Sequence, residues 1–390
     1  YSVTLFEARK CVGGHANTVI ARHPFGCTPV DTGFIVYNEK NYPCLSRLFR
    51  QLNVETQPSN MSFGVSLDGG AMEYEGSLRG MIAQPSNLIR PGYYRMCCDI
   101  ARFYKTAPAV LKRPDSDVLS LGSYLQQEDY STEFVYNHLL PMGSAIWSCS
   151  CDDMLAFPAG SFVRFFHNHG LLSFSNRPKW RTVVGGSREY LKQFTSAFSD
   201  SIRLNTPIVG LRRDKDGIHL RTQFEQFAPF DSVILATHAD QTLKIIGADA
   251  TELECSILGK IRYSKNRAIL HQDPKLMPHR RKAWASWNYL SSRSEDGTQQ
   301  VSVTYWMNRL QNLDERVPLF VSLNPIAEPE PNTVLGHYSY EHPILDLEAR
   351  VAQTNLQHIQ GQRNTWFCGS YTGYGFHEDG LKSGLLVAES

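Results

Sequence analysis

The chain lacks several features that mark specialised classes of protein. No apolar run approaches the roughly 20 residues that a membrane-spanning helix needs. The formal net charge is only +1, so composition gives no electrostatic reason to expect a nucleic-acid partner. No repeat or low-complexity segment interrupts the 390 residues, of which 42% are hydrophobic and 20% charged. These values are typical of globular proteins, and the length predicts about two domains.

The nine cysteines form neither a disulfide framework nor a metal pattern. Their number is odd, Cys97 and Cys98 are adjacent, and the pair Cys149 and Cys151 has no second pair at zinc spacing. We therefore expect no metal site, and reduced thiols in a reducing compartment, the cytoplasm.

The glycine-rich turn Gly-x-Gly-x-x-Gly is also absent, although the strand and the acid that normally follow it in the sequence are present. Val3, Leu5 and Phe6 form a short β-prone run that ends at Glu7, and Gly13-Gly14 follow six residues later. In a nucleotide-binding βαβ unit such an acid accepts hydrogen bonds from ribose hydroxyls. Side-chain-free glycines let backbone amides approach a pyrophosphate. The alternatives are an exposed strand-end acid and an ordinary turn.

In this interpretation the run that opens at Tyr1 is the second strand of the unit. The first strand, the glycine turn and its helix are then expected upstream, and the chain as given is expected to be a fragment.

The end of the chain has a matching pattern. An apolar strand, Trp366-Phe367, leads into the glycine-rich loop Gly369-Ser370 to Gly375, and a helix is expected to start near Phe376-His377. Glu378 and Asp379 suit the first helical turn, where negative charge meets the positive end of the helix dipole. A helix N-terminus can also hold an electron-rich oxygen of a cofactor, such as the C2 carbonyl of a reduced isoalloxazine.

Taken together, these two segments resemble the flavin-containing amine oxidase superfamily, in which the first and last segments jointly wrap FAD. Longer motifs narrow the resemblance to predicted NAD/FAD-binding proteins found beside or fused to cyclopropane-fatty-acid synthases. The motifs are His15 to Val19, Pro29 to Asn38, Phe165 to Leu172, Trp284 to Tyr289 and Thr304 to Gln311. They span essentially the whole chain.

The resemblance implies an α/β fold: a Rossmann-like FAD-binding domain, without its first βα unit, and an inserted α+β substrate domain. The FAD-binding domain is predicted over residues 1–58, 179–247 and 351–390, and the substrate domain over 59–178 and 248–350. The expected cofactor-binding residues are Glu7, Gly13, Gly14, His15, Val209, Gly369, Ser370, Phe376, His377, Glu378 and Asp379. Val209 would hold the adenine through its backbone, and His377 is the candidate for catalysis.

Two of these positions depart from the wider superfamily. His15 stands where an arginine is common, which removes a fixed positive charge because histidine is mostly neutral at pH 7. Ser370 stands where many relatives place an acid on the ribityl chain, and a hydroxyl binds there more weakly. Cys368 offers either a thioether to the flavin or a thiol packed inside the strand. Some amine oxidases place a lysine at flavin N5. Lys260, Lys265 and Lys282 are the candidates for this role, and sequence context does not distinguish them.

Local patterns predict several elements. Helical spacing of apolar residues favours helices over 42–52, 95–111, 121–140 and 188–198. Residues 231–237 read as a buried parallel strand, and 301–305 alternate as a strand. A polar cluster formed by His167, Asn168 and His169 either lines the active site or caps the helix before Gly170. We favour helix capping. The aromatic residues are core or the wall of a long apolar pocket: Trp147, Phe165, Phe166, Trp180, Trp284, Trp287, Tyr289, Tyr305 and Trp306.

Two functions remain open from the sequence. The first is a flavin-dependent oxidoreductase that takes a hydride from an apolar, possibly lipid acyl, or amine-bearing substrate. The second is a non-catalytic flavin-fold partner of a lipid-modifying methyltransferase, the cyclopropane-fatty-acid synthase. An ammonium substrate needs an acid or carbonyl to fix it, and Glu73, Glu75 and Asp99 are the candidates in the inserted segments.

Overall fold

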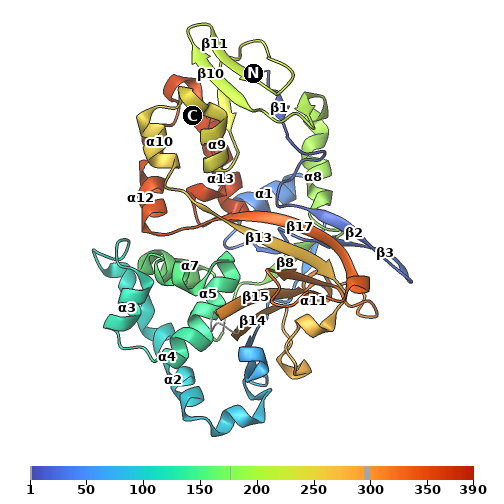
Figure 1. The fold of residues 1–390 in the computed structure, drawn as a ribbon, viewed down its shortest axis with the longest axis vertical. Coiled ribbons are helices and arrows are strands. Elements are labelled where there is room, and N and C mark those ends of the chain that lie inside the picture. The colour runs from blue at the N-terminus through green and yellow to red at the C-terminus, as the bar shows by residue number, and fades with distance from the viewer. Residues whose placement is uncertain (1, 176, 294–298) are drawn as a thin grey trace.

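The computed structural model describes residues 2–175, 177–293 and 299–390. Tyr1, which opens the strand predicted at the start of the chain, lies outside the described residues. Elements from both ends of the chain share the upper half of the molecule, and a long sheet with a helical layer forms the lower half (Figure 1). No helix in the described residues is long and apolar enough to cross a membrane.

The lower half is built on a seven-stranded sheet of order β17–β13–β16–β15–β14–β6–β7. All neighbours are antiparallel except β14 and β6. The strands are β17 (Val334–Pro343), β13 (Tyr263–His271), β16 (Phe320–Leu323), β15 (Gln299–Trp306), β14 (Trp287–Arg293), β6 (Phe63–Leu67) and β7 (Met72–Glu75). The strand predicted over 301–305 is confirmed, but both of its faces are buried at Ser302 to Trp306 because β15 is a central strand.

Helices of the middle of the chain cover this sheet and share one apolar core with it. They are α2 (Pro91–Thr106), α3 (Leu121–Gln127), α4 (Thr132–Phe134), α5 (Leu140–Trp147), α6 (Cys151–Leu155) and α7 (Ala159–Asn168). The helix expected over 121–140 is wrong as one element. Asp129 adopts a left-handed conformation with φ of 52°, which ends the first helix, and the hydroxyl of Ser131 accepts from the N–H of Phe134 to start the next.

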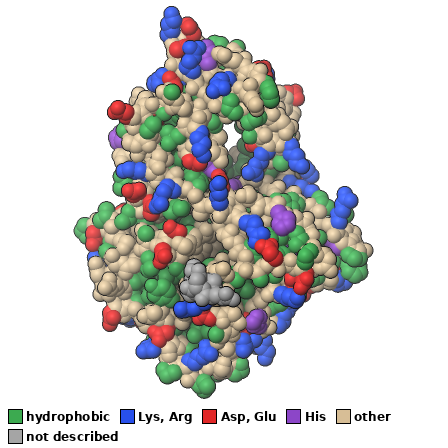
Figure 2. All heavy atoms as spheres, in the orientation of Figure 1, with side chains coloured by type: hydrophobic (Ala, Val, Ile, Leu, Met, Phe, Trp, Pro, Cys, Tyr) green, Lys and Arg blue, Asp and Glu red, His purple; other side chains and the backbone are tan. Residues whose placement is uncertain are grey.

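The upper half holds two separate pairs of parallel strands. β1 (Leu5–Phe6) pairs with β9 (Ile202–Arg203), and β12 (Val233–Leu235) pairs with β18 (Thr365–Phe367). No ladder joins these pairs in the described residues, and the surface is hollowed in this half (Figure 2). The strand predicted over 231–237 is parallel as expected, but it is not fully buried, since Ile234 is 54% exposed.

Small antiparallel units complete the strands: β2 (Thr18–His23) with β3 (Gly26–Asp31), β10 (Gly210–Asp214) with β11 (Gly217–Arg221), and β4 (Tyr37–Asn38), β8 (Trp180–Val183) and β5 (Thr56–Pro58) together. The remaining helices are α1 (Pro43–Gln51), α8 (Arg188–Thr195), α9 (Ala239–Ile246), α10 (Glu252–Leu258), α11 (Met307–Gln311), α12 (Leu347–Asn355) and α13 (His377–Glu389). The helix predicted over 42–52 matches α1. Those predicted over 95–111 and 188–198 correspond to α2 and α8, each followed by 3₁₀ turns.

The fully buried carboxylate of Asp31 joins elements that are distant in the sequence. It accepts hydrogen bonds from the backbone N–H and hydroxyl of Ser187 and from the hydroxyl of Thr18. Gln311 donates its amide to the same carboxylate and accepts from the N–H of Asp31. A buried carboxylate is stable only with such partners, so this residue fixes β3 against α8 and α11.

Replacing Asp31 by Asn turns one acceptor oxygen into a donor that faces other donors. We expect the free energy of unfolding to fall by about 1–3 kcal/mol, because buried donors lose their acceptor. Urea denaturation measures the change. The exposed Asp231→Asn variant is the control and should stay within about 0.5 kcal/mol of the parent. Equal stability of the two variants would contradict the account.

Candidate functional site

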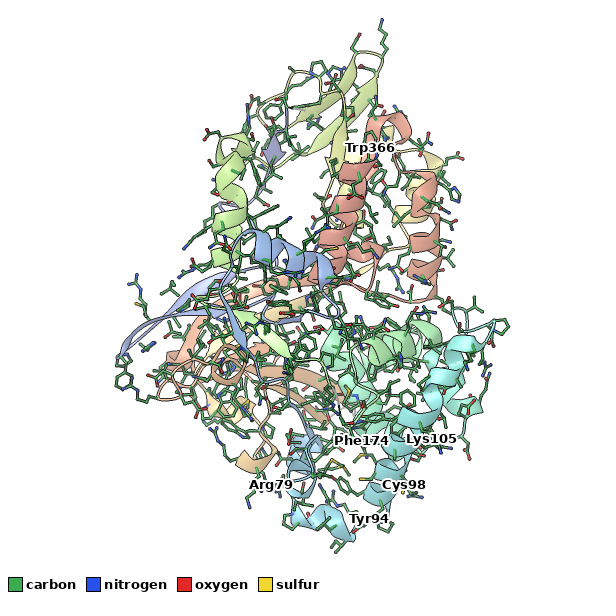
Figure 3. The ribbon with its side chains drawn as sticks, turned by 180° about the vertical axis from the view of Figure 1, so that it is seen from behind. Arg79, Tyr94, Cys98, Lys105, Phe174 and Trp366 are labelled. Atoms are coloured by element: carbon green, nitrogen blue, oxygen red, sulfur yellow. The ribbon has the colours of Figure 1, made fainter. Side chains whose placement is uncertain are left out.

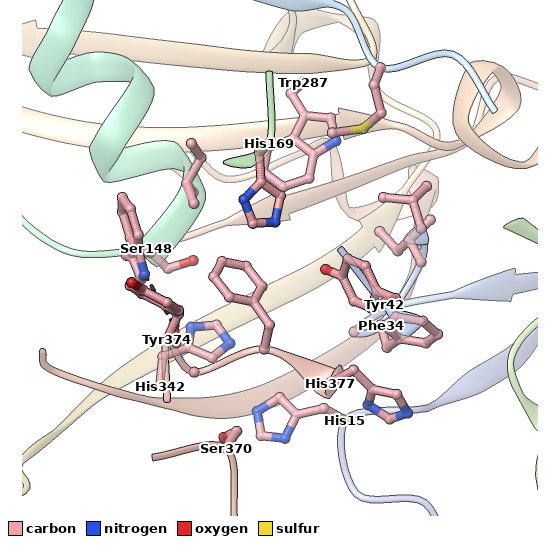
Figure 4. Close-up of a pocket in the computed structure, with 18 of the residues that line it drawn as sticks. His15, Phe34, Tyr42, Ser148, His169, Trp287, His342, Ser370, Tyr374 and His377 are labelled. Atoms are coloured by element: carbon pink, nitrogen blue, oxygen red, sulfur yellow. Dashed lines mark hydrogen bonds between the residues drawn. The ribbon is translucent and has the colours of Figure 1, made fainter. Parts of the chain in front are cut away.

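A cavity of about 1710 Å³ lies where the upper and lower halves meet. Seven of the sequence-predicted site residues line it: Gly13, Gly14, His15, Gly369, Ser370, Phe376 and His377. They come from the first and last segments of the chain, and His15, Ser370 and His377 lie close together on one side of the pocket (Figure 4). The other end of the cavity is lined by the inserted segments, including Tyr74, Ile100 and Tyr104. One cavity therefore connects the predicted cofactor region with the predicted substrate region.

Glu378 and Asp379 occupy the first turn of α13, as predicted, but they do not line the cavity. The two carboxylate oxygens of Glu378 accept from the backbone N–H groups of Cys44 and Leu45, at the start of α1. Asp379 accepts from the N–H groups of Tyr374 and Phe376 and so closes the preceding loop. Both acids thus shape the wall, by fixing α1 to α13 and by ordering the glycine-rich loop.

Glu7 and Val209 also lie outside the cavity lining. Glu7 follows β1, as expected, and its Oε1 accepts from the N–H of Arg9 at 2.8 Å. The N–H of Val209 is donated to the carbonyl of Arg221, so that donor is already used within a hairpin. Val209 lines a smaller cavity of about 480 Å³ between β10, β11 and α9.

The cavity wall has features that fit a flavin cofactor. Gly14 and Gly384 both line it, and a Cβ built on either would meet no atom within 4 Å. Gly14 has φ of 56°, a conformation that other residues rarely adopt. The Nε2 atom of His15 is buried and has no hydrogen-bond partner among the described residues. Backbone without side chains lets a flat ligand approach closely, and the unpaired buried nitrogen needs a hydrogen-bond partner, which a polar ligand can supply.

The position of His15 is set by tight packing of the backbone. A Cβ at Gly33 would collide with the carbonyl oxygen of His15, so only glycine fits there. That carbonyl also accepts from the N–H of Phe34 at 2.7 Å. Next to it, Asn17, Thr32 and Tyr340 form a closed set of side-chain hydrogen bonds, which attaches this segment to β17.

Three imidazoles gather beside this turn. The ring of His15 lies 5.4 Å from that of His342 and 6.2 Å from that of His238. Burial lowers the pKa of His15 to about 3 and that of His342 to about 4, and neighbouring histidines add to both effects. Asn266 lies 3.1 Å from Nδ1 of His342 and fixes its ring. At neutral pH these two rings are therefore uncharged hydrogen-bonding groups.

His377 begins α13 and lines the cavity. Its ring stacks on Phe34 at 4.2 Å, and its Nε2 lies 2.6 Å from the hydroxyl of Tyr190. Burial lowers the pKa of His377 to about 4. Its neighbour across the loop, Cys368, lines the cavity, and burial raises the pKa of this thiol to about 11. The thiol is therefore protonated at neutral pH.

The structure adds His138, which no local motif indicated, to the cavity wall. His138 and His169 both line the cavity, and burial lowers the pKa of each to about 4. His169 was expected to be structural, and it both ends α7 and faces the cavity. The aromatic residues divide: Trp147, Phe165, Trp180, Trp287 and Tyr305 line the cavity, whereas Phe166, Trp284, Tyr289 and Trp306 do not.

Lysine is absent from the cavity lining in the described residues. Lys260, Lys265 and Lys282 are all exposed on the surface, so none of these three candidates reaches the site. Arg177 is the one basic side chain other than histidine in the described lining. The polar part of the described lining is therefore mostly imidazoles and hydroxyls, with Glu75, Glu341 and Arg177 as its charged side chains.

Filling the open space beside α13 tests where the cofactor binds. In Gly384→Leu the new side chain projects into the cavity, so flavin retention should fall at least tenfold. Stability without flavin should be equal or higher, because replacing a helical glycine removes a cost of about 1 kcal/mol. Absorbance after desalting and thermal unfolding measure the two effects. Ala388→Leu, on the exposed part of the same helix, is the control. Full flavin retention by Gly384→Leu would exclude this placement.

The buried histidines predict sensitivity to acid. His377 has a pKa of about 4 when folded and 6.5 as its ordinary value, so between these pH values the unfolded chain binds a proton that the folded protein does not. The unfolding free energy should therefore fall as pH drops from about 6.5 to 4, by up to about 1.4 kcal/mol per pH unit for each such group.

Denaturation at several pH values tests this linkage. His377→Phe should remove one proton from the pH dependence, whereas Tyr190→Phe should lower stability and leave the dependence unchanged. A pH dependence that is identical in the parent and in His377→Phe would show that this imidazole is not buried as described.

Comparisons with known proteins agree with this geometry. The family model for flavin-containing amine oxidoreductase matches residues 1–269. A search among functionally curated proteins finds no match. Similar solved structures include a fatty acid isomerase from P. acnes that produces CLA (14% identity, TM-score 0.66, covering 99% of this chain and 92% of that chain). They also include cyclohexylamine oxidase from Brevibacterium oxydans IH-35A (12% identity, TM-score 0.69, covering 99% and 93%).

A putrescine oxidase bound to putrescine is similar as well, with 13% identity and a TM-score of 0.67 over 99% of this chain and 92% of that chain. At such identities the structures establish the fold, which confirms the predicted α/β amine-oxidase-like class. The family model covers more than half of the chain and carries the cofactor and the reaction type with it. The chain belongs to the flavin-containing amine oxidoreductase family, and it is an FAD-dependent oxidoreductase.

Proposed function

We propose that this enzyme oxidises the acyl chain of a lipid, with FAD as the hydride acceptor. The observation that supports the proposal best is the lining of the part of the cavity away from Gly14 and Gly384. Its residues are mostly apolar or aromatic: Met61, Phe63, Ile100, Tyr104, Met142, Ile146, Trp147, Phe165, Leu171, Phe174, Trp287, Tyr305 and Leu323. A long flexible hydrocarbon is the ligand that such a wall binds, because burial of its apolar surface drives binding.

The size of the cavity supports the same substrate class. Its volume of about 1710 Å³ exceeds the roughly 300–1,000 Å³ of a site for one drug-sized ligand. The end beside Gly14 and Gly384 accommodates the flavin, and the apolar end remains for the chain. The FAD supplies two-electron redox chemistry when bound. The protein's contribution is to position the chain and to exclude water from it.

The acids of the inserted segments do not favour an ammonium ligand. Glu73 accepts from the backbone N–H groups of His279 and Arg280 and pairs with the Arg280 side chain, and it does not line the cavity. Asp99 accepts from Ser131, also outside the lining. Glu75 lines the cavity but accepts from the backbone and hydroxyl of Ser77. Glu341 also lines the cavity, and its Oε2 lies 3.3 Å from Nδ1 of His238. The two acids of the described lining, Glu75 and Glu341, therefore each have a polar neighbour within the protein, which disfavours their use in fixing an amine.

The similar structures do not decide between these substrates by themselves. One is a fatty acid isomerase and others are amine oxidases, so the fold serves both classes. The lining of this chain's own cavity is therefore the basis for proposing acyl lipids.

The proposed oxidation balances with oxidised flavin as the oxidant. Bound FAD would accept a hydride equivalent from one acyl carbon, and the adjacent carbon would lose a proton, so that a carbon–carbon double bond would remain. The neutral imidazoles of the cavity wall, His377 among them, are the candidates to accept that proton. A cytoplasmic location is part of this proposal, supported by nine cysteines that all carry free thiols.

Anaerobic stopped-flow spectroscopy tests the substrate class. We expect fatty-acyl or phospholipid substrates to bleach the flavin absorbance of the loaded enzyme, and simple primary amines to leave it unchanged. Bleaching by amines without a response to acyl lipids would restore an amine substrate. A flavin that no substrate reduces, in a protein that binds a cyclopropane-fatty-acid synthase, would instead support the role of a non-catalytic partner.

Two adjacent cysteines of α2 provide a matched test of the cavity. Cys97 lines the cavity, whereas its neighbour Cys98 is exposed and does not line it (Figure 3). Cys97→Trp should obstruct the chain and slow flavin reduction by a dispersed long-chain substrate at least tenfold, with flavin content unchanged. Cys98→Trp should behave as the parent does. Equal rates for both variants would place the acyl chain elsewhere.

A further inference from the structure

Exposed apolar side chains surround the outer end of the cavity. Leu78, Ile89 and Phe174 are 93%, 84% and 72% exposed, and Ile82 and Leu88 are exposed as well. We call these five residues the apolar rim. Isolated exposed apolar residues are ordinary, but this group lies within short segments beside one opening. Exposed apolar side chains concentrated in segments next to a cavity opening indicate a surface that another phase or molecule covers.

The rim is continuous with the cavity. Leu78 and Phe174 line the cavity although they are largely exposed, so they mark the point where it opens to the surface. The ring of Phe174 lies 4.8 Å from that of Tyr104, which leads inward along α2. The apolar rim is therefore continuous with aromatic and apolar residues of the cavity wall.

The segment of the rim that holds Ile82, Leu88 and Ile89 is tied to the sheet by buried side chains, so the exposure of these residues is a built feature. Buried Gln84 accepts from the N–H of Glu73, and buried Asn87 donates to the carbonyl of the same residue. These amides tie the turns η2 (Gly80–Ile82) and η3 (Pro85–Ile89) to β7. The polar side chains of this segment thus face inward, whereas Ile82, Leu88 and Ile89 face solvent, which reverses the usual arrangement.

The charge around the rim is positive. Residues 71–112 contain six Lys or Arg and three acids, of which Glu73 is fully buried. Arg79 and Lys105 lie in the same lower region of the molecule as Tyr94 and Phe174 (Figure 3). Neither Arg79 nor Arg177 forms an ion pair among the described residues, and both are exposed. Basic side chains around apolar ones suit an anionic lipid surface.

The same charges disfavour a second copy of the chain as the occupant. In a twofold contact each rim would face its own counterpart, which brings like charges such as Arg79 and Arg177 together. A bilayer with anionic headgroups instead meets them with opposite charge. It also accepts the apolar side chains among its acyl chains.

We propose that the apolar rim, with Arg79 and Arg177, docks the enzyme on an anionic lipid surface and admits an acyl chain between Leu78 and Phe174. This inference rests on the proposed acyl-chain function for its purpose, but docking itself requires no turnover. The two claims can therefore fail separately.

Vesicle sedimentation tests the docking. The flavin-loaded protein is mixed with vesicles of phosphatidylcholine alone or with 30% phosphatidylglycerol, at about 0.1 M salt. We expect binding to the anionic vesicles to be at least tenfold tighter, and to weaken in 0.5 M salt. The double variant Ile82→Asp/Ile89→Asp should lose at least tenfold in binding, since neither residue lines the cavity. Arg79→Glu should weaken binding to anionic vesicles only.

Phe224→Asp is the matched control, because Phe224 is 91% exposed but belongs to the distant β10–β11 region. It should bind vesicles as the parent does, and thermal unfolding should show that all variants are folded. Equal binding by Ile82→Asp/Ile89→Asp and Phe224→Asp would overturn the proposal. So would a concentration-dependent dimer, seen by light scattering, that the double variant abolishes. Vesicle binding without flavin reduction by acyl lipids would retain the surface and reject the proposed function.

Discussion

The buried carboxylate of Asp31 holds the arrangement on which the cavity depends. It receives donors from Thr18, Ser187 and Gln311, which belong to three distant parts of the chain. Burial raises the pKa of Asp31 to about 6, although these hydrogen bonds oppose the shift. Because the carboxylate cannot be left without partners, the hairpin β2–β3, the start of α8 and α11 must come together. The walls of the cavity are fixed as a consequence.

A second constraint is the chemistry of those walls. Around the predicted cofactor region the chain places His15, His342 and His377, and burial lowers the pKa of each. Uncharged imidazoles both donate and accept hydrogen bonds, so they can serve the polar edge of a flavin without placing a fixed charge beside an apolar substrate. The departure from arginine at His15 thus agrees with a cavity whose lining away from the glycines is mostly apolar and aromatic.

The sequence predicted those parts of the site that short motifs encode. The strand before Glu7, the turn at Gly13-Gly14 and the loop before His377 each follow from local patterns, and the structure brings the glycines and His377 to one cavity. Glu378 illustrates the limit, because its position in α13 was predictable but its partners, the amides at the start of α1, were not. The residues that line the cavity away from the glycines are harder still to predict from the sequence. Tyr74, His138 and Tyr305 converge only through the sheet and its helical layer, and no pattern along the chain relates them.

The central claim is that one cavity holds flavin at its glycine-lined end and an acyl chain at its aromatic end. Anomalous X-ray diffraction from crystals of the flavin-loaded enzyme with a long-chain ω-bromo fatty acid tests it most directly. The account predicts flavin density beside Gly14 and Gly384, and a bromine peak inside the cavity among Ile100, Tyr104 and Trp147. A bromine peak only on the protein surface, or in the smaller cavity beside Val209, would contradict it.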